Sequence, residues 1–265
     1  MMSHFWTSLA GVMLAIAVSL AAHRARALSD SGAMAAAICG SLAMMAGWRW
    51  GVMLVAYFVG ATWLSRFRAT EKAARLGGFT EKAGARDATQ VLANGGVFAA
   101  AALAFAISPH PFWQALAAGG LAASAADTWA TELGVLSTSP PRSILTWTAV
   151  APGTSGGVSA LGFLAGLAGA AFMTIIIWTV RWPAVAALSA LLGGTFGCVL
   201  DSIVGASLQA QRWCAVCAVT TEQRTHGCGS LTNMTRGFRW LDNDGVNAIA
   251  TVGGALFGGV LASYF

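Results

Sequence analysis

The sequence predicts an all-α, polytopic membrane protein with about seven to eight transmembrane helices. Of its 265 residues, 57% are hydrophobic and only 9% are charged, whereas a soluble domain carries about a quarter charged residues. Long apolar runs alternate with polar segments, and most runs approach the 20 or so residues that cross a hydrocarbon core of roughly 30 Å. The 11 tryptophans, many of them near the ends of these runs, are typical of the interfacial belts of membrane proteins.

The first half of the chain contains four apolar runs, at residues 5–22, 31–47, 50–65 and 87–107. No lysine or arginine precedes the first run, while Arg24 and Arg26 follow it, which favours an uncleaved anchor with its N-terminus outside. Between the third and fourth runs, residues 66–86 form the most charged part of the chain, with six basic residues against two acids. We expect this segment to be a basic cytoplasmic loop.

The second half contains four more runs, at residues 112–131, 158–180, 184–207 and 245–265. Two longer polar segments separate some of them: residues 132–157, with three prolines and a Gly-Thr-Ser-Gly-Gly sequence, and residues 208–241, with three of the five cysteines. We expect both segments to be cytoplasmic loops. All the runs are expected to belong to one integral membrane domain that covers residues 1–265.

Basic residues decide the predicted orientation. If the N-terminus lies outside, the segments after the first, third, fifth and seventh runs are cytoplasmic and contain 13 of the 15 basic residues. This distribution satisfies the positive-inside rule, so we expect these segments to face the cytoplasm, in a bacterial inner membrane. The same bias explains the net charge of +5, which therefore does not indicate a nucleic-acid partner.

The end of the fifth run contains the most informative polar pattern. Ser124, Asp127, Thr128 and Thr131 lie three or four positions apart, on one stripe of a helix, and Glu132 lies at its edge. Acids in or beside a membrane span are costly unless they face a partner, a cation or water. Asp127 also lies at the C-terminal end of its helix, where the helix dipole disfavours an acid. We therefore expect Asp127 and Glu132 to be functional.

Other polar residues of the predicted spans also gather at the cytoplasmic ends, whereas the outer ends have few. Asp201 ends the seventh run in the same disfavoured position as Asp127. Asp87 and Asp242 could simply cap their helices, and the glycine-rich segment before the sixth run could be only a hinge. A structural protein has no need for such one-sidedness, which indicates a functional site. The further positions that we assign to it are Arg86, Asp87, Gln90, Asn94, Ser155, Gly156, Gly157, Asp201, Asn243, Asp244 and Asn247.

The chemistry of these groups is that of a phosphate and metal site. Clustered carboxylate and amide oxygens suit Mg²⁺, which binds through one or two carboxylates together with substrate phosphates. The glycine-rich segment before a helix offers backbone N–H groups to a phosphate, and the basic loop adds positive charge. The sequence contains no P-loop motif, so a nucleotide would have to bind in another way. Phosphate, a divalent cation and acids at a membrane face are typical of an enzyme that acts on a lipid phosphate.

A separate cluster of cysteines and a histidine lies in residues 208–241. Cys214 and Cys217 form a Cys-x-x-Cys pair, and His226 and Cys228 complete the cluster within 15 residues. Three thiolates and an imidazole can hold Zn²⁺ in tetrahedral geometry. The predicted topology places this segment in the cytoplasm, where structural disulfides are rare, so the alternative is a set of thiols without a metal.

Five of these motifs, taken together and in this order, resemble those of a known family. The residues that carry the resemblance are 84–96, 126–132, 152–159, 201–206 and 240–247. They are similar to the motifs of an integral membrane family that includes the chloroplast phytyl-phosphate kinase of vitamin E synthesis and transmembrane protein 19, and that is also catalogued as a domain of unknown function. Residues 214–228 are similar to a stretch found in many members, so the resemblance covers nearly the whole chain.

The resemblance implies a membrane-embedded kinase that transfers a phosphoryl group from a nucleoside triphosphate, such as CTP, to a phytyl-like isoprenoid monophosphate. It would use Mg²⁺, and the prenyl tail would lie in the bilayer between the Ala- and Gly-rich spans. We assign catalytic roles to Asp87, Asp127, Glu132 and Asp201. The expected Mg²⁺ ligands are Asp127, Glu132, Asp201 and Asp244. The expected substrate and phosphate contacts are Arg86, Gln90, Asn94, Ser155, Gly156, Gly157, Asn243 and Asn247.

Two other functions are compatible with acids in membrane spans. A secondary transporter would place its polar residues near the bilayer midplane and would show repeat symmetry, and the sequence has neither feature. A CDP-alcohol or cytidylyl transferase would also use Mg²⁺ and a membrane lipid. The regularly spaced series of aspartates that such a transferase carries along one helix is absent from the sequence.

Overall fold

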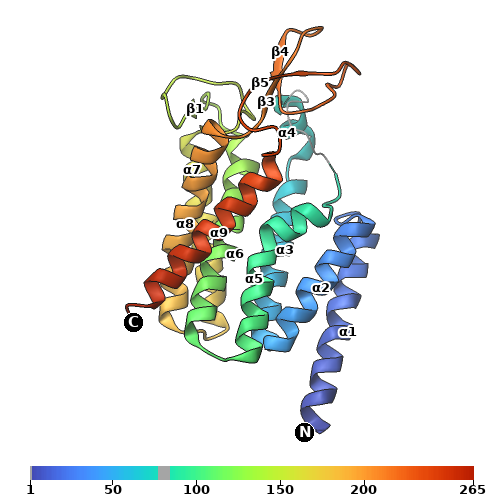
Figure 1. Ribbon diagram of the computed structural model, residues 1–265, viewed down its shortest axis with the longest axis vertical. Coiled ribbons are helices and arrows are strands. Elements are labelled where there is room, and N and C mark those ends of the chain that lie inside the picture. Colours follow the sequence, from blue (N-terminus) through green and yellow to red (C-terminus); the bar gives the residue numbers. More distant parts are fainter. Residues whose placement is uncertain (1, 77–83) are drawn as a thin grey trace.

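The computed structural model describes residues 2–76 and 84–265, and for residues 2–8 it describes only the backbone. Figure 1 shows the order of the elements along the chain. The helices are α1 (Met2–Arg24), α2 (Asp30–Ala46), α3 (Trp48–Arg66), α4 (Ala69–Leu76), α5 (Ala88–Ile107), α6 (Pro111–Gly134), α7 (Ala160–Thr179), α8 (Ala184–Ser207) and α9 (Asn243–Ala262). The strands are β1 (Arg142–Ser143), β2 (Gly157–Val158), β3 (Gln211–Cys214), β4 (Val219–Thr221) and β5 (Asn233–Arg236).

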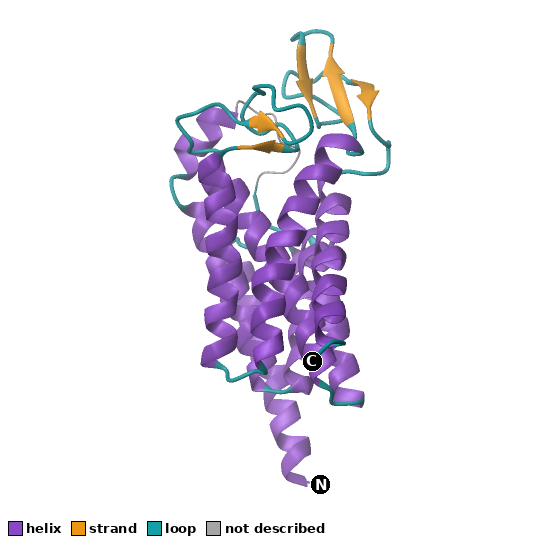
Figure 2. Ribbon diagram, turned by 90° about the vertical axis from the view of Figure 1, so that its left-hand side faces the viewer, coloured by secondary structure: helices purple, strands orange, loops and turns teal. Residues whose placement is uncertain are grey.

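The long helices form one bundle, and the strands lie at one end of it only (Figure 2). We call this end the polar end; the N- and C-termini lie toward the opposite end. Within the described residues, α5, α7, α8 and α9 are each long and apolar enough to cross a membrane, and α1 and α2 contribute shorter apolar stretches. The predicted all-α, polytopic fold is thus confirmed. The side of the membrane that the polar end faces stays a prediction.

The structure changes three of the predicted boundaries. α6 continues to Gly134, so Glu132 belongs to a helix rather than to a loop. The basic loop contains the short amphipathic helix α4, which buries Lys72, while residues 77–83 of that loop lie outside the described residues. The segment 208–241 contains a three-stranded antiparallel sheet in the order β4-β3-β5. Its strands are too short to show the alternation of apolar and polar residues that reveals a strand in a sequence.

α6 is the central helix of the bundle. It packs against α3, α5, α7, α8 and α9. Between Ala115 and Ala126, every buried residue of α6 except Leu121 is alanine, glycine or serine. Lipid tails are as apolar as the side chains, so close packing rather than the hydrophobic effect holds membrane helices together. The small residues of α6 make that close packing possible on several sides at once.

Three glycines from three helices meet in this interior: Gly119 of α6, Gly193 of α8 and Gly254 of α9. A Cβ atom at Gly254 would lie 2.8 Å from the backbone oxygens of both other glycines, closer than real Cβ atoms come. A Cβ atom at Gly193 would likewise lie 2.7 Å from the Gly254 oxygen. Only glycine therefore lets the three backbones touch at this point, which we call the three-glycine contact.

The opposite end of the bundle has an aromatic core. The ring centroid of Trp50 lies 4.7 Å from that of Trp182 and 5.2 Å from that of Phe105. These rings line a pocket together with Arg49 and Gln114, which are its charged and amide groups. Acidic residues are absent from its lining, so the two ends of the bundle differ in chemistry.

The three-glycine contact generates a stability prediction. Gly254→Ala should lower the free energy of unfolding by about 1–3 kcal/mol, because the added methyl group forces the three helices apart. The measurement is the midpoint of thermal unfolding of the purified protein in detergent, which should fall by several degrees.

The matched control is Gly95→Ala in α5, where a Cβ atom would meet only Leu54, at 3.8 Å. The midpoint of this variant should stay the same or rise, because alanine is favoured over glycine in a helix by about 0.5–1 kcal/mol. Equal effects of the two substitutions would show that the three-glycine contact has no special role.

Candidate functional site

Two acids from different helices meet near the polar end. The carboxyl groups of Asp127, on α6, and Asp201, on α8, lie within hydrogen-bonding reach of each other. The two helices run in the same direction, and each acid follows its helix's glycine of the three-glycine contact by eight residues, or about 12 Å. On the antiparallel helix α9, Asn247 lies seven residues from Gly254, at nearly the same level. The helix packing thus explains why these predicted site residues come together.

The contact between these acids has a chemical consequence. Two ionised carboxylates in contact repel each other, so either a shared proton or a bound cation must offset their charge. The Oδ2 atom of Asp201 is buried and has no hydrogen-bond partner within the described residues. Buried polar atoms are nearly always paired. The pair therefore has the charge and the spare oxygen that suit a bound cation.

Hydrogen bonds connect this level of α6 to three further helices. The Ser124 hydroxyl donates to the backbone oxygen of Asn94 on α5, at 2.8 Å, and lies 3.0 Å from the Thr251 hydroxyl on α9. Thr128 is hydrogen-bonded to Tyr57 on α3. The polar stripe predicted on α6 therefore forms hydrogen bonds with several neighbouring helices, because α6 is surrounded by them.

Glu132 is paired with a lysine of the predicted basic loop. Its carboxylate forms an ion pair with Lys72 of α4, whose side chain is 6% exposed. Lys72 also donates to the backbone oxygens of Leu64, at 2.7 Å, and Ser65, at 3.1 Å, near the C-terminal end of α3. α4 thus connects the ends of α3 and α6, and the charge of Glu132 is already neutralised by the protein.

The predicted residues at the start of α5 form a helix cap. The Asp87 carboxylate accepts a hydrogen bond from the Gln90 N–H at 3.0 Å, and the Gln90 side chain accepts one from the Asp87 N–H at 3.2 Å. This reciprocal pair is a capping box, so the capping alternative is confirmed for Asp87, with Gln90 as its partner. The Asn94 side chain donates to the Gln90 backbone oxygen at 2.8 Å. Their predicted roles in catalysis and substrate binding remain predictions.

The start of α9 is also capped by an acid. The Asp242 carboxylate accepts a hydrogen bond from the Gly245 N–H at 3.0 Å. The neighbouring predicted residues differ in burial: Asp244 is 4% exposed, Asn247 is partly buried and Asn243 is exposed. Burial favours Asp244 and Asn247 over Asn243 as members of an enclosed site.

Arg86, the predicted phosphate-binding cation, is held by α3. Its guanidinium donates to the Thr62 hydroxyl at 3.0 Å, and its central carbon lies 5.8 Å from the centre of the Phe58 ring. Both contacts stabilise the cation in place, the second through the negative face of the ring. A phosphate bound to the Arg86 guanidinium would therefore lie beside the Thr62 hydroxyl and the Phe58 ring.

The glycine-rich segment packs on the end of α8. Gly156 has a positive φ of 74°. A Cβ atom at Gly156 would lie only 2.6 Å from the backbone oxygen of Ser202, the residue that follows Asp201, so only glycine fits there. The Ser155 hydroxyl donates to the carboxylate of Glu222 in the segment 208–241. Gly157 belongs to β2 and its N–H donates within its own turn. The Thr154 N–H also donates to the backbone oxygen of Ala151, so within the described residues the N–H groups of Ser155 and Gly156 are the ones left for a ligand.

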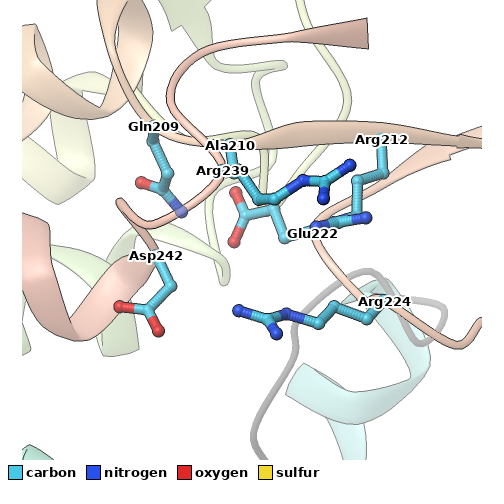
Figure 3. Close-up of a pocket in the computed structure, with 7 residues that line it drawn as sticks. All are labelled: Gln209, Ala210, Arg212, Glu222, Arg224, Arg239 and Asp242. Atoms are coloured by element: carbon cyan, nitrogen blue, oxygen red, sulfur yellow. The ribbon is translucent and has the colours of Figure 1, made fainter. Parts of the chain in front are cut away.

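A charged pocket at the polar end contains residues that the sequence analysis did not select (Figure 3). It is a shallow depression that is open to solvent, with an enclosed volume of only about 10 Å³. Figure 3 shows the side chain of Arg224 extending toward Asp242. We call it the arginine pocket; its lining residues are Gln209, Ala210, Arg212, Glu222, Arg224, Arg239 and Asp242.

The sequence does not reveal the arginine pocket, because positive-inside bias already explains arginines in a polar segment. Arg212 and Arg239 are 27 positions apart in the sequence, and only the folding of the strands brings them together. One residue of the pocket stood out in the sequence: Glu222 is the single acid between residues 202 and 241.

Glu222 connects the arginine pocket to the acid pair. It lines the pocket, accepts a hydrogen bond from Ser155, and lies close enough to Asp201 for the two charges to interact. The acid pair, the glycine-rich segment and the arginine pocket are therefore neighbours. Together they form the candidate site.

The cysteine and histidine cluster predicted from the sequence is also formed. One ligand atom from each of Cys214, Cys217, His226 and Cys228 lies within 4.8 Å of the others. Hydrogen bonds from the Ser230 side chain, and next from His226, lower the pKa of the Cys228 thiol to about 5. The pKa of the Cys217 thiol is raised to about 11, and the main cause is a hydrogen bond with Cys228. The cluster thus contains thiols of very different acidity.

Comparison with known proteins identifies the family. A family model described as "Integral membrane protein DUF92" matches residues 13–255. The chain belongs to this family. The family relationship expected from the motifs is confirmed, and the matched region of this DUF92 protein includes the whole candidate site.

Relatives of this DUF92 protein occur in plants, archaea and cyanobacteria. Protein PGR of Arabidopsis thaliana is 29% identical over 267 residues, which cover 90% of both chains. An uncharacterized membrane protein of Methanocaldococcus jannaschii is 29% identical over 199 residues, 74% of this chain and 80% of its own. Another, from Synechocystis sp., is 32% identical over 173 residues, 63% of this chain and 66% of its own. No solved structure matches the chain. These names state no activity, so membership of the DUF92 family establishes an integral membrane protein.

The ion pair between Lys72 and Glu132 generates a second stability prediction. Lys72→Met should lower the free energy of unfolding by about 1–3 kcal/mol, because a carboxylate and two backbone oxygens lose their donor. Glu132→Gln should lower the free energy of unfolding less in the Lys72→Met background than in the wild-type protein, because the two residues interact. Thermal unfolding in detergent measures all three variants.

Arg68→Met is the control, since Arg68 makes a more exposed ion pair with Glu71 on the same helix. Its loss should cost less than about 1 kcal/mol. If the effects of the Lys72 and Glu132 substitutions simply add, the ion pair does not hold α4 against the bundle.

Proposed function

We propose that this protein is a membrane-embedded kinase that transfers a phosphoryl group from a nucleoside triphosphate to an isoprenoid monophosphate. The observation that carries the proposal is the contact between Asp127 and Asp201 beside the arginine pocket. Membership of an integral membrane family supports a substrate that resides in the bilayer. The isoprenoid class rests on the resemblance of the five motifs to those of the phytyl-phosphate kinase family.

The acid pair fits Mg²⁺ by its donor atoms. Asp127 and Asp201 present carboxylates from two helices, and the Oδ2 atom of Asp201 has no hydrogen-bond partner in the described part of the chain. Mg²⁺ is usually held by one or two carboxylates together with phosphates, whose negative charge it neutralises. Asp244 is a further buried acid at the polar end, whereas Glu132 is already paired with Lys72. We therefore propose Asp127 and Asp201 as the main ligands.

The arginine pocket suits the phosphates of the nucleotide. Its three arginines present planar guanidinium groups, which bind phosphate through paired hydrogen bonds. The pocket lies among the strands and loops of the polar end, so a water-soluble nucleotide reaches it without entering the bilayer. Glu222 places the pocket next to Asp201. The transferred phosphoryl group would therefore lie between the pocket and the acid pair.

The acceptor needs little chemical activation, because a monophosphate is already an oxyanion. Catalysis then consists of holding donor and acceptor in line and offsetting their negative charge. The path expected for the prenyl tail changes: Ala118 and Ala122, in the small-residue interior, are 0% exposed, and the backbones of three helices touch at the three-glycine contact. The tail would lie on the outer, lipid-facing surface of the bundle instead.

A direct assay tests the proposal. The protein in detergent, supplied with Mg²⁺, a prenyl monophosphate and labelled CTP, ATP, GTP or UTP, should form a prenyl diphosphate with at least one pair. Asp127→Asn and Asp201→Asn should each lower kcat by about 100-fold or more, because each removes a charge that the transfer requires.

Asp30→Asn is the control, because this acid begins α2 at the polar end and its side chain is 97% exposed. The variant should keep full activity. Transfer of the nucleotidyl group to the lipid would identify a cytidylyl transferase, and full activity of Asp127→Asn would remove this residue from the site. Absence of diphosphate with every pair would refute the kinase.

The arginine pocket generates a separate kinetic prediction. Arg224→Gln and Arg239→Gln should each raise KM for the nucleotide by about 10-fold or more, since a charge-assisted hydrogen bond contributes about 1.5–3 kcal/mol. KM for the prenyl phosphate should change much less. Arg236→Gln is the matched control: it lies in the same sheet, exposed and outside the pocket lining, and should leave both constants unchanged. An equal rise of both KM values would place the nucleotide elsewhere.

A further inference from the structure

The sheet at the polar end brings four metal-binding side chains to one point. Cys214 ends β3, and Cys217 lies in the turn between β3 and β4. His226 and Cys228 lie in the loop between β4 and β5. Two chain segments thus contribute two ligands each. The sheet itself, not the membrane bundle, positions the group.

The distances within this group match a tetrahedral zinc site. The sulfur atoms of Cys214 and Cys228 are 3.7 Å apart, and Nδ1 of His226 lies 3.3 Å from the Cys228 sulfur. Two sulfurs each about 2.3 Å from one zinc ion, at the tetrahedral angle, are about 3.8 Å apart. A sulfur and an imidazole nitrogen on the same ion are about 3.5 Å apart. All four ligand atoms lie within 4.8 Å of one another, so side-chain shifts of about 1 Å would bring them all to tetrahedral distances around a single ion.

The donor set selects the metal and its role. Three thiolates and an imidazole are soft to borderline ligands, which favour Zn²⁺ and not the hard cation Mg²⁺. Four protein ligands fill the tetrahedron, so no position stays open for water or substrate, as in structural zinc sites. A disulfide needs sulfur atoms about 2.05 Å apart, far less than the separation between Cys214 and Cys228.

The surrounding sheet needs a cross-link of this kind. Its strands are only three or four residues long, and few of their side chains are buried. Such a small sheet cannot bury enough apolar surface to be stable by itself. A zinc ion that joins β3 to the loop between β4 and β5 would supply the missing stability, as in other small metal-bound modules.

We propose that Cys214, Cys217, His226 and Cys228 bind one structural Zn²⁺ ion that holds the sheet and, through it, the arginine pocket. Arg212 lies two residues before Cys214 on β3, and Arg224 lies two residues before His226. Fixing the two ligand segments therefore fixes two of the three arginines. The effect on the nucleotide rests on the proposed kinase function, whereas zinc binding itself does not.

Metal analysis of the purified protein tests the site. Wild-type protein in detergent, washed with EDTA to remove loosely held ions, should contain about one zinc per chain by mass spectrometry. The double variant Cys214→Ser/Cys228→Ser should contain almost none. The matched control, Cys39→Ala/Cys198→Ala, removes the same number of thiols from α2 and α8 and should keep its zinc.

A second measurement on wild-type protein covers the case in which the double variant does not fold. Cobalt exchanged into the site should give the visible absorption of tetrahedral cobalt thiolate. N-ethylmaleimide should modify Cys217 and Cys228, which are exposed, only after a strong chelator has removed the metal. Wild-type protein without zinc and with freely reactive thiols would overturn the proposal, and so would full zinc in the double variant.

The two proposals can fail independently. Zinc present without any prenyl diphosphate would leave the metal site in place and refute the kinase. If both hold, removal of zinc should raise KM for the nucleotide in the same way as Arg224→Gln, with a smaller change in KM for the prenyl phosphate. An unchanged KM for the nucleotide after metal removal would refute the link between the zinc ion and the arginine pocket.

Discussion

The three-glycine contact of α6, α8 and α9 determines the rest of the arrangement. In a bilayer, helices associate by close packing, and backbones approach most closely where no side chain separates them. Because α6 and α8 run in the same direction, this contact fixes their axial register, and it places Asp127 and Asp201 at one level near the polar end. A slip of one helical turn, about 5.4 Å, would separate the two carboxyl groups. The chemistry at the polar end thus depends on packing deep inside the bundle.

The features that the sequence predicts well are those that the bilayer imposes. Apolar runs mark the helices because their lengths match the membrane, and Asp127 and Asp201 stand out because acids within membrane helices are costly. Pairings could not be predicted in the same way. Lys72 and Glu132 are 60 positions apart, and Ser155 and Glu222 are 67 apart, so only the tertiary structure decides that they meet.

Sequence patterns also left ambiguities that geometry removes. Asp87 was a candidate both for a helix cap and for chemistry, and the observed capping box with Gln90 confirms the cap. Three of the four arginines of the segment 208–241 line a pocket, a property that the sequence did not reveal because the positive-inside rule already explains basic residues there. The spacing of the cysteines, by contrast, already indicated the cluster that the sheet assembles.

The filled interior of the bundle has a consequence for substrate selection. An enzyme that encloses a lipid tail can measure its length, because the end of the cavity stops longer chains. Between α6, α8 and α9 the small side chains are buried and the backbones touch. Under the proposed function, the substrate tail would therefore meet mainly lipid on the outer surface, and such a site would recognise the phosphate headgroup and accept tails of different lengths.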